Sequence, residues 1–148
     1  MSAAPAAARS RTFRGGVHPH ESKESTQALP IERMPFVAEY VLPLSQHIGA
    51  PSRAVVEVGE RVQRGQLIAA PAGFVSVALH APVTGEVTAI DLRLHPNGRM
   101  MPAIVITTDP LDSQRIPETH PVDPASLSPQ EMVSMVQNGG LVGLGGAA

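Results

Sequence analysis

Two short apolar segments, each folded back on itself at glycine, constrain the fold of this chain more than any other feature. The first covers residues 55–68, where Gly59 and Gly65 bracket a tight turn, and the second covers residues 80–90, where the bend falls at Gly85. Glycine adopts positive φ and allows close backbone approach, which other residues tolerate only with strain. Together, the two segments predict a small, flattened β-barrel.

Short strands separated by turns are predicted for residues 36–108. The chain has 15 prolines and 13 glycines among its 148 residues, and this content favours strands and turns over long helices. Aromatic residues make up only 3% of the chain, so valine, leucine and isoleucine must supply most of the core. The spacing is typical of an all-β barrel or sandwich rather than of alternating β–α units. The expected strands cover residues 39–44, 54–58, 66–70, 73–80, 86–92 and 102–108.

This pattern resembles the barrel-sandwich hybrid, the fold that biotinyl and lipoyl carrier domains share. Carriers of that family hold an acceptor lysine on a hairpin tip between the two halves of the barrel. The corresponding region, residues 69–77, contains no lysine, and Lys23 is the only lysine of the chain. We therefore expect the scaffold without covalent carrier chemistry, with Phe74 at or near the hairpin tip.

The remainder of the chain divides into three parts around this barrel, which we assign to residues 31–108. Residues 1–30 are expected to form an extended or disordered arm, and residues 109–127 a proline-rich linker that wraps the surface. In residues 128–148, Ser128-Pro129-Gln130-Glu131 is a capping box with proline at the first helical position. It predicts a short helix over 129–138, stopped by Gly139 and Gly140.

Several strings of residues resemble the N-terminal part of RnfC, also called RsxC, a subunit of the ion-translocating Rnf electron-transport complex. The string Ser45-Gln46-His47-Ile48-Gly49-Ala50-Pro51 is specific, whereas the Gly-Glu turn is shared with every lipoyl-like domain. The resemblance extends from about residue 13 to the end. The matching stretches are residues 15–19, 43–51, 58–66, 73–76, 80–85, 95–98 and 102–106.

The glycine-rich end of the chain resembles the opening of the flavin- and NADH-binding domain of that family. Such a loop brings backbone N–H groups close to phosphate oxygens, aided by a following helix N-terminus. The resemblance makes Gly140, Gly143, Gly145 and Gly146 candidates for a partial phosphate loop. The expected fold is thus mainly β, with a short C-terminal helix that leads into a truncated α/β domain.

The resemblance implies that this chain is the N-terminal structural and docking portion of the NADH-oxidising subunit of a membrane-associated complex. The parent subunit would transfer electrons from or to NAD(H) through FMN and 4Fe-4S clusters, at the cytoplasmic face of the inner membrane. We expect none of these cofactors on this chain, which has no cysteine, and no catalysis by the chain alone. The alternative is a stand-alone lipoyl-like ligand-binding or interaction module without a covalent cofactor.

The expected partners are the other subunits of the complex and the flavin-binding domain, with Phe74 and His47 as candidate contact residues. Phe74 either anchors such a contact or caps the barrel's own core, and the sequence leaves both interpretations open. His47 and His80, next to glycine and proline, are expected to fix turns rather than to catalyse. His18 and His20 fit an ordinary surface pair better than metal ligands.

The charge and hydropathy of the chain argue against nucleic acid as a partner and against direct insertion into a membrane. A formal net charge of −2 provides no electrostatic footprint for nucleic acid. No run of residues approaches the roughly 20 consecutive apolar residues that a membrane-spanning helix needs, so we expect no direct membrane insertion.

Overall fold

A computed structural model describes residues 22–143, divided into two units between Met34 and Pro35. The described part of the first unit, residues 22–34, is exposed throughout. It contains one turn, in which the N–H groups of Thr26 and Gln27 donate to the carbonyl oxygen of Lys23 at 3.0 and 2.8 Å.

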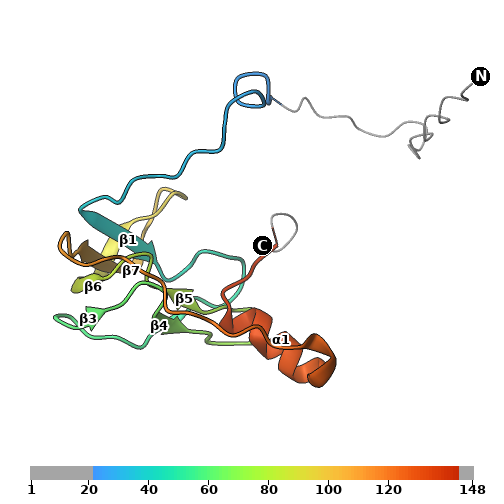
Figure 1. Ribbon diagram of the computed structural model, residues 1–148. Helices are drawn as coiled ribbons and strands as arrows, with labels where there is room; N and C mark the ends of the chain where they lie inside the picture. The colour runs from blue at the N-terminus through green and yellow to red at the C-terminus, as the bar shows by residue number, and fades with distance from the viewer. Residues whose placement is uncertain (1–21, 144–148) are drawn as a thin grey trace, which may run out of the picture. The chain divides into compact units, whose positions relative to one another are not determined.

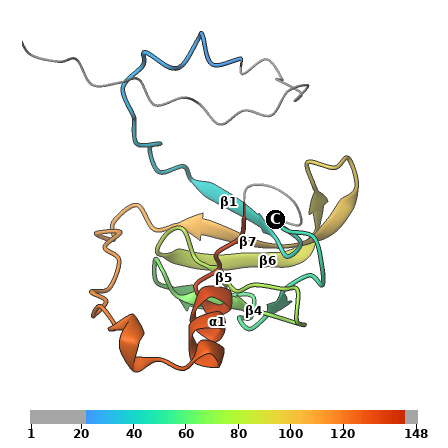
Figure 2. The same cartoon turned by 90° about the vertical axis from the view of Figure 1, so that its right-hand side faces the viewer.

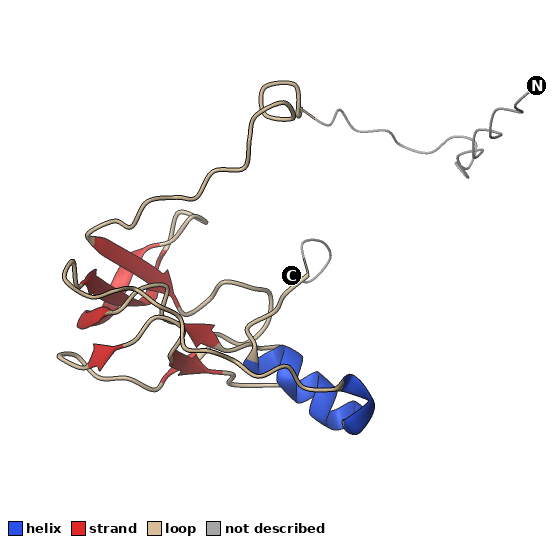
Figure 3. Cartoon of the chain, viewed as in Figure 1, coloured by secondary structure: helices blue, strands red, loops and turns tan. Residues whose placement is uncertain are grey.

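The second unit is built on two antiparallel sheets (Figures 1 and 3). The larger has the strand order β1-β7-β6-β3, and the smaller the order β2-β4-β5. The strands are β1 (Glu39–Pro43), β2 (Arg53–Ala54), β3 (Arg61–Val62), β4 (Leu67–Ala70), β5 (Leu79–His80), β6 (Gly85–Leu94) and β7 (Met100–Thr108). The mainly β fold expected from the glycine-folded segments is confirmed.

One hydrophobic core joins the two sheets. Val87 of β6 and Ile106 of β7 are fully buried and lie opposite each other in the sheet register. Val62 of β3 and Ile68 of β4, one from each sheet, join the same cluster. Each such aliphatic side chain contributes about 1.5–3 kcal/mol when it is fully removed from water. The core is aliphatic, as the scarcity of aromatic residues requires.

Two of the glycines that predicted the barrel are required for different reasons. Gly65 has φ +88°, a conformation that a side chain strains, and its N–H donates to the carbonyl oxygen of Ala81 at 2.8 Å. Gly85 lies at the start of β6, where an added Cβ would overlap the backbone carbonyl of Thr107 on β7. The first glycine therefore serves a turn, and the second a close approach between neighbouring strands.

Two expected strands are much longer in the prediction than in the structure. Of residues 73–80, only Leu79 and His80 pair in a sheet. The backbone before them is hydrogen-bonded by other elements, with the Val75 carbonyl accepting from the Ala50 N–H at 2.9 Å. Of residues 54–58, only Ala54 is in β2, because the chain then turns and the Glu57 N–H donates to the Glu60 carboxylate at 3.0 Å.

A 3-10 turn (Pro124–Ser126) precedes helix α1 (Pro129–Asn138), which has the predicted bounds. The Glu131 N–H donates to the Ser128 hydroxyl at 3.3 Å, and the Ser128 N–H donates to the Glu131 carboxylate at 2.7 Å. Hydrogen bonds from the Ser128 side chain and backbone lower the pKa of Glu131. The capping box is thus formed in both directions. Figure 2 shows α1 beside the strands of the smaller sheet.

Candidate functional site

The loop that takes the place of the carrier hairpin, residues 71–78, is fastened at several points; we call it the tip loop. The Ala72 N–H donates to the Ser76 hydroxyl at 3.0 Å, which closes the loop on itself. The Ser52 hydroxyl donates to the Val77 carbonyl at 2.7 Å and fixes the loop to the barrel. Phe74, at the apex, is 95% exposed. It therefore does not cap the barrel core, and its role as an interaction residue stays a prediction.

Helix α1 is attached to the tip loop through Gln137. Its side-chain amide donates to the carbonyl oxygens of Ser76 at 2.8 Å and Gly73 at 3.0 Å. Its own carbonyl accepts the N–H of Ala78 at 3.0 Å. Gln137 thus bonds two carbonyl groups of the tip loop through its side chain and the N–H of the last tip-loop residue through its backbone. The position where carriers present lysine is instead tied to a helix.

A groove of about 510 Å³ lies between the tip loop and α1. We call it the tip–helix groove. Its lining is mostly aliphatic and includes no Lys, Arg, Asp or Glu among the described residues. Its lining includes His47 and Ile48 from the 45–51 loop, Phe74 from the tip loop, Val133 and Val136 from α1, and Leu141.

His47 borders this groove with an unusual imidazole. Both ring nitrogens are buried, and neither has a hydrogen-bond partner among the described residues. Burying an unpaired polar group costs about 1–3 kcal/mol, so such groups normally have a partner. The expected role of His47 in fixing its turn through a ring hydrogen bond is not seen. His95 has that role instead, with Nε2 2.9 Å from the Ser45 carbonyl and Nδ1 accepting from the Asn97 N–H at 3.1 Å.

The first glycine of the predicted phosphate loop ends the helix. Gly140 has φ +71°, and its N–H donates to the Gln137 carbonyl at 3.2 Å. The Leu141 N–H donates to the Val136 carbonyl at 3.3 Å. This pair of bonds is a Schellman motif with glycine at the left-handed position. This motif alone explains why residue 140 is a glycine, so no phosphate contact is needed to account for it.

The remaining glycines of the predicted loop are placed only in part. Gly143 is exposed and lies at the edge of the tip–helix groove. Gly145 and Gly146 lie outside the described residues. Phosphate binding by this stretch therefore stays a prediction. The candidate surface pair His18 and His20 also lies outside the described residues.

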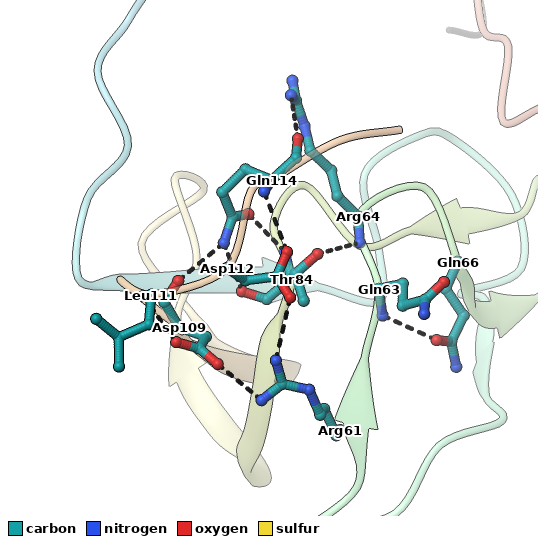
Figure 4. A network of polar contacts seen from close by, with 9 residues as sticks. All are labelled: Arg61, Gln63, Arg64, Gln66, Thr84, Asp109, Leu111, Asp112 and Gln114. Carbon is teal, nitrogen blue, oxygen red and sulfur yellow. Dashed lines mark hydrogen bonds and ion pairs between the residues drawn. The ribbon is translucent and has the colours of Figure 1, made fainter. Parts of the chain in front are cut away.

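A second site, which is polar and was not predicted from the sequence, attaches the start of the proline-rich segment to the barrel (Figure 4). The Gln114 side chain is buried and bonds both backbone groups of Thr84, accepting from its N–H at 2.7 Å and donating to its carbonyl at 3.0 Å. It also donates to the Asp109 carbonyl at 3.0 Å. Gln114 has φ +54°, an uncommon conformation that these bonds hold. A glutamine in a linker with no periodicity gives no sequence signal for such burial.

Arg61 and Arg64 extend this fastening along the same segment. The Arg61 guanidinium lies 2.8 Å from the Asp109 carboxylate and 3.2 Å from that of Asp112. The Leu111 N–H and the Arg61 guanidinium together lower the pKa of Asp109, while Asp109 raises the pKa of Arg61. The Arg64 guanidinium donates to the Gln114 carbonyl at 3.1 Å. Residues 109–114, the start of the expected linker, are therefore bonded directly to the barrel surface.

The described residues contain neither a cluster of three side chains suited to a metal ion nor a helix long and apolar enough to cross a membrane. The most distinctive surface among them is the tip–helix groove, which combines exposed aliphatic side chains, an exposed phenylalanine and buried imidazole nitrogens without partners. Exposed apolar surface of this kind marks interaction sites in many proteins.

A family model and several known proteins that resemble this chain point to the same family. A family model described as the RnfC barrel sandwich hybrid domain matches residues 11–111. The C subunit of an ion-translocating oxidoreductase complex from Pseudomonas aeruginosa is 46% identical over 138 residues, which cover 91% of this chain. The C subunit of a proton-translocating ferredoxin:NAD(+) oxidoreductase complex from Clostridium ljungdahlii is 41% identical, over 93% of the chain.

The corresponding subunit of a Na(+)-translocating ferredoxin:NAD(+) oxidoreductase complex from Acetobacterium woodii is 40% identical, over 92% of this chain. The chain spans only 18%, 30% and 31% of the lengths of these three relatives, respectively. It corresponds to their N-terminal part.

Proposed function

This chain belongs to the RnfC barrel sandwich hybrid domain family, and on that premise we propose that it is the N-terminal structural and docking portion of the NADH-oxidising subunit of an Rnf-type electron-transport complex. The observation that carries the proposal is the match to the C subunits of such complexes over nine-tenths of the chain at 40–46% identity. The barrel supplies a rigid body, and the chain leads through α1 toward the rest of the subunit.

In this proposal, the redox chemistry belongs to the parts of the subunit beyond this chain. Two of the relatives carry ferredoxin and NAD(+) in their names, which fits electron transfer through FMN and 4Fe-4S clusters in the parent subunit. Iron–sulfur clusters are held mainly by cysteine thiolates, and this chain has no cysteine. Its contribution to cofactor binding would be limited to the glycine-rich opening of a flavin and NADH domain at Gly140, Gly143, Gly145 and Gly146.

The proposed location is the cytoplasmic face of the inner membrane, where the chain is held through other subunits of the complex. The tip–helix groove and the exposed Phe74 support a role in assembly, because exposed apolar surface of this kind marks interaction sites. His47, whose ring nitrogens find no hydrogen-bond partner within residues 22–143, is the second proposed contact residue.

The test is isolation of the native protein from its source organism. An N-terminal affinity tag on this chain should recover, from detergent-solubilised membranes, the other subunits of an Rnf-type complex, identified by mass spectrometry. The recovered subunit should be larger than the 15.5 kDa of this chain and carry flavin. Protease treatment of inside-out vesicles should cleave it, whereas intact spheroplasts should protect it. Recovery of a free 15.5 kDa chain without these subunits would instead favour the stand-alone interaction module.

A further inference from the structure

We propose that the tip–helix groove is the surface on which the next domain of the same subunit docks. The groove comprises the apex of the tip loop, the apolar face of α1, and the segment that leaves the helix. This inference rests on the proposed function, since it requires a longer subunit, and it names the partner and the residues of the contact.

Helix α1 carries an apolar stripe that is not packed against the barrel. None of the ten residues of this helix is buried, and on the side that lines the groove Val133 is 63% exposed and Val136 is 50% exposed. Isolated helices shorter than about 12–15 residues are marginal in water, and most helices in proteins are stabilised by packing of an apolar face. The caps and the Gln137 bonds fix the ends of α1 but leave its stripe without packing. The exposed apolar stripe of α1 is therefore typical of a helix that packs against another domain.

The imidazole of His47 indicates what kind of surface the groove would bind. Its buried nitrogens border the groove and lack a hydrogen-bond partner among the described residues. A docked body that presents a backbone N–H or carbonyl group there would remove the energetic penalty of an unpaired polar group. The groove is thus complementary to an uncharged, mainly aliphatic surface with at least one hydrogen-bonding group. A charged partner is disfavoured, because the described lining side chains include no residue of fixed charge.

The position of the groove in the chain favours the following domain as its occupant. The groove wall itself continues into the segment that follows the helix, through Leu141, Val142 and Gly143. The relatives continue well beyond this point, since the chain spans 18–31% of their lengths. A domain tethered within a few residues of the groove has an effective concentration of about a millimolar, far above that of a second copy or a separate subunit. The following domain therefore has the strongest access to this surface.

The test uses single cysteine substitutions, which are unique within this chain because it has no cysteine of its own. Val133→Cys and Ile48→Cys place a thiol on two different parts of the groove lining, helix α1 and the 45–51 loop. Leu94→Cys is the matched control, because Leu94 is 72% exposed at the end of β6 and does not line the groove. Each variant is labelled with a maleimide in the isolated 148-residue chain, in the full-length subunit and in the whole complex. Modification at the introduced cysteine is followed by peptide mass spectrometry.

We expect both groove cysteines to react at least about tenfold more slowly in the full-length subunit than in the isolated chain, since ~1.4 kcal/mol of docking free energy already gives that factor. The control should react equally fast in all three samples. Fast labelling of the groove in the subunit and the complex overturns the proposal. Protection only in the whole complex assigns the groove to another subunit and overturns it as well, while the proposed function stands.

Concentration-dependent protection in the isolated chain would show that a second copy covers the groove, which also overturns the proposal. Failure of the proposed function is detected separately, because the tagged chain would then not co-purify with the complex. The two failures are therefore distinguishable.

Discussion

The side-chain amide of Gln137 donates to the carbonyl oxygen of Ser76 at 2.8 Å, and this bond joins helix α1 to the loop where carrier domains of this fold hold their lysine. A swinging carrier arm needs a free hairpin tip, whereas here the tip is bonded to the last turn of a helix. The relationship explains how the scaffold can serve as a fixed assembly element. It also indicates where the stability of α1 comes from.

Replacing Gln137 with alanine should loosen the attachment of α1 to the barrel without unfolding the barrel, because only the backbone bond from the Ala78 N–H remains. The change removes the amide that donates to the Ser76 and Gly73 carbonyls, and such bonds contribute about 0.5–1.5 kcal/mol each. Hydrogen exchange followed by mass spectrometry should show faster exchange over residues 129–138 and little change in β6 and β7. Gln130→Ala, on the exposed first turn of α1, is the control and should leave the exchange of the helix nearly unchanged. Equal effects of the two substitutions would contradict the proposed anchoring.

Gln114→Ala should destabilise the whole barrel by about 1–3 kcal/mol, because it leaves the buried N–H of Thr84 without its partner, while the Thr84 carbonyl keeps only the bond from the Asp109 N–H. Urea unfolding gives the free energy directly from the shift of the midpoint. Arg115→Ala changes the neighbouring, exposed residue and should shift the free energy of unfolding by no more than about 0.5 kcal/mol. An unfolding midpoint of the Gln114 variant equal to that of wild type would show that this fastening is dispensable.

The two barrel glycines should differ when each is replaced with alanine. Gly65→Ala places a side chain at φ +88°, with its nearest neighbour, a methyl carbon of Ile116, at 3.4 Å, so the loss should be about 1–2 kcal/mol from backbone strain. Gly85→Ala drives Cβ into the backbone of β7, which must then move, and we expect a loss of about 3 kcal/mol or more. Thermal unfolding of the two variants should therefore rank Gly85→Ala as the less stable. The reverse order would show that the β6–β7 approach is more adaptable than the structure indicates.

The Asp109 carboxylate makes the attachment of the 109–114 segment depend on pH. Its pKa is lowered by the Leu111 N–H and by Arg61, from an ordinary value of 3.8. A lowered pKa in the folded state means that the stabilisation is complete above 3.8 and is lost as pH falls through the lower folded value. Asp109→Asn should therefore reduce the acid-side slope of stability, measured by urea unfolding at a series of acidic pH values. The two proteins should show parallel profiles near neutral pH, and an unchanged acid slope would exclude this contribution.

The local signals in the sequence predicted local structure well, and they failed where tertiary contacts decide. The Ser128 capping box and the glycines after Asn138 predicted α1 with its bounds, because caps act within one helical turn. Gln114 was hidden in the proline-rich segment, since its burial depends on the backbone of Thr84, 30 residues away in sequence. The apolar content of residues 73–78 predicted a strand, yet their backbone groups bond the 45–52 loop and Gln137.

In the candidate site, too, features set by local sequence were predictable and features set by tertiary contacts were not. The place of Phe74 at the tip was predictable, since glycine and proline mark the turn around it, but the sequence left open whether its ring is exposed, and the structure shows it 95% exposed. The groove beside it was not foreseen, because it exists only where α1 returns to the tip loop. Family resemblance made Gly140 a candidate phosphate contact, whereas the pattern Asn-Gly-Gly predicted that it helps to end the helix, and the structure confirms this second role.

Phe74→Ala tests whether the exposed apex is a contact residue. Because Phe74 is 95% exposed, its truncation should change the free energy of unfolding of the isolated chain by no more than about 0.5 kcal/mol. Ile68→Ala, in the fully buried core, provides the contrast and should cost about 2–5 kcal/mol. In the full-length subunit, by contrast, loss of an interface aromatic should weaken docking by more than about 1 kcal/mol. Faster maleimide labelling of the Val133→Cys thiol in the Phe74→Ala background would report that weakening. If the isolated chain instead melts several degrees lower and the labelling rate of that thiol is unchanged, Phe74 stabilises the barrel itself and is not part of the docking surface.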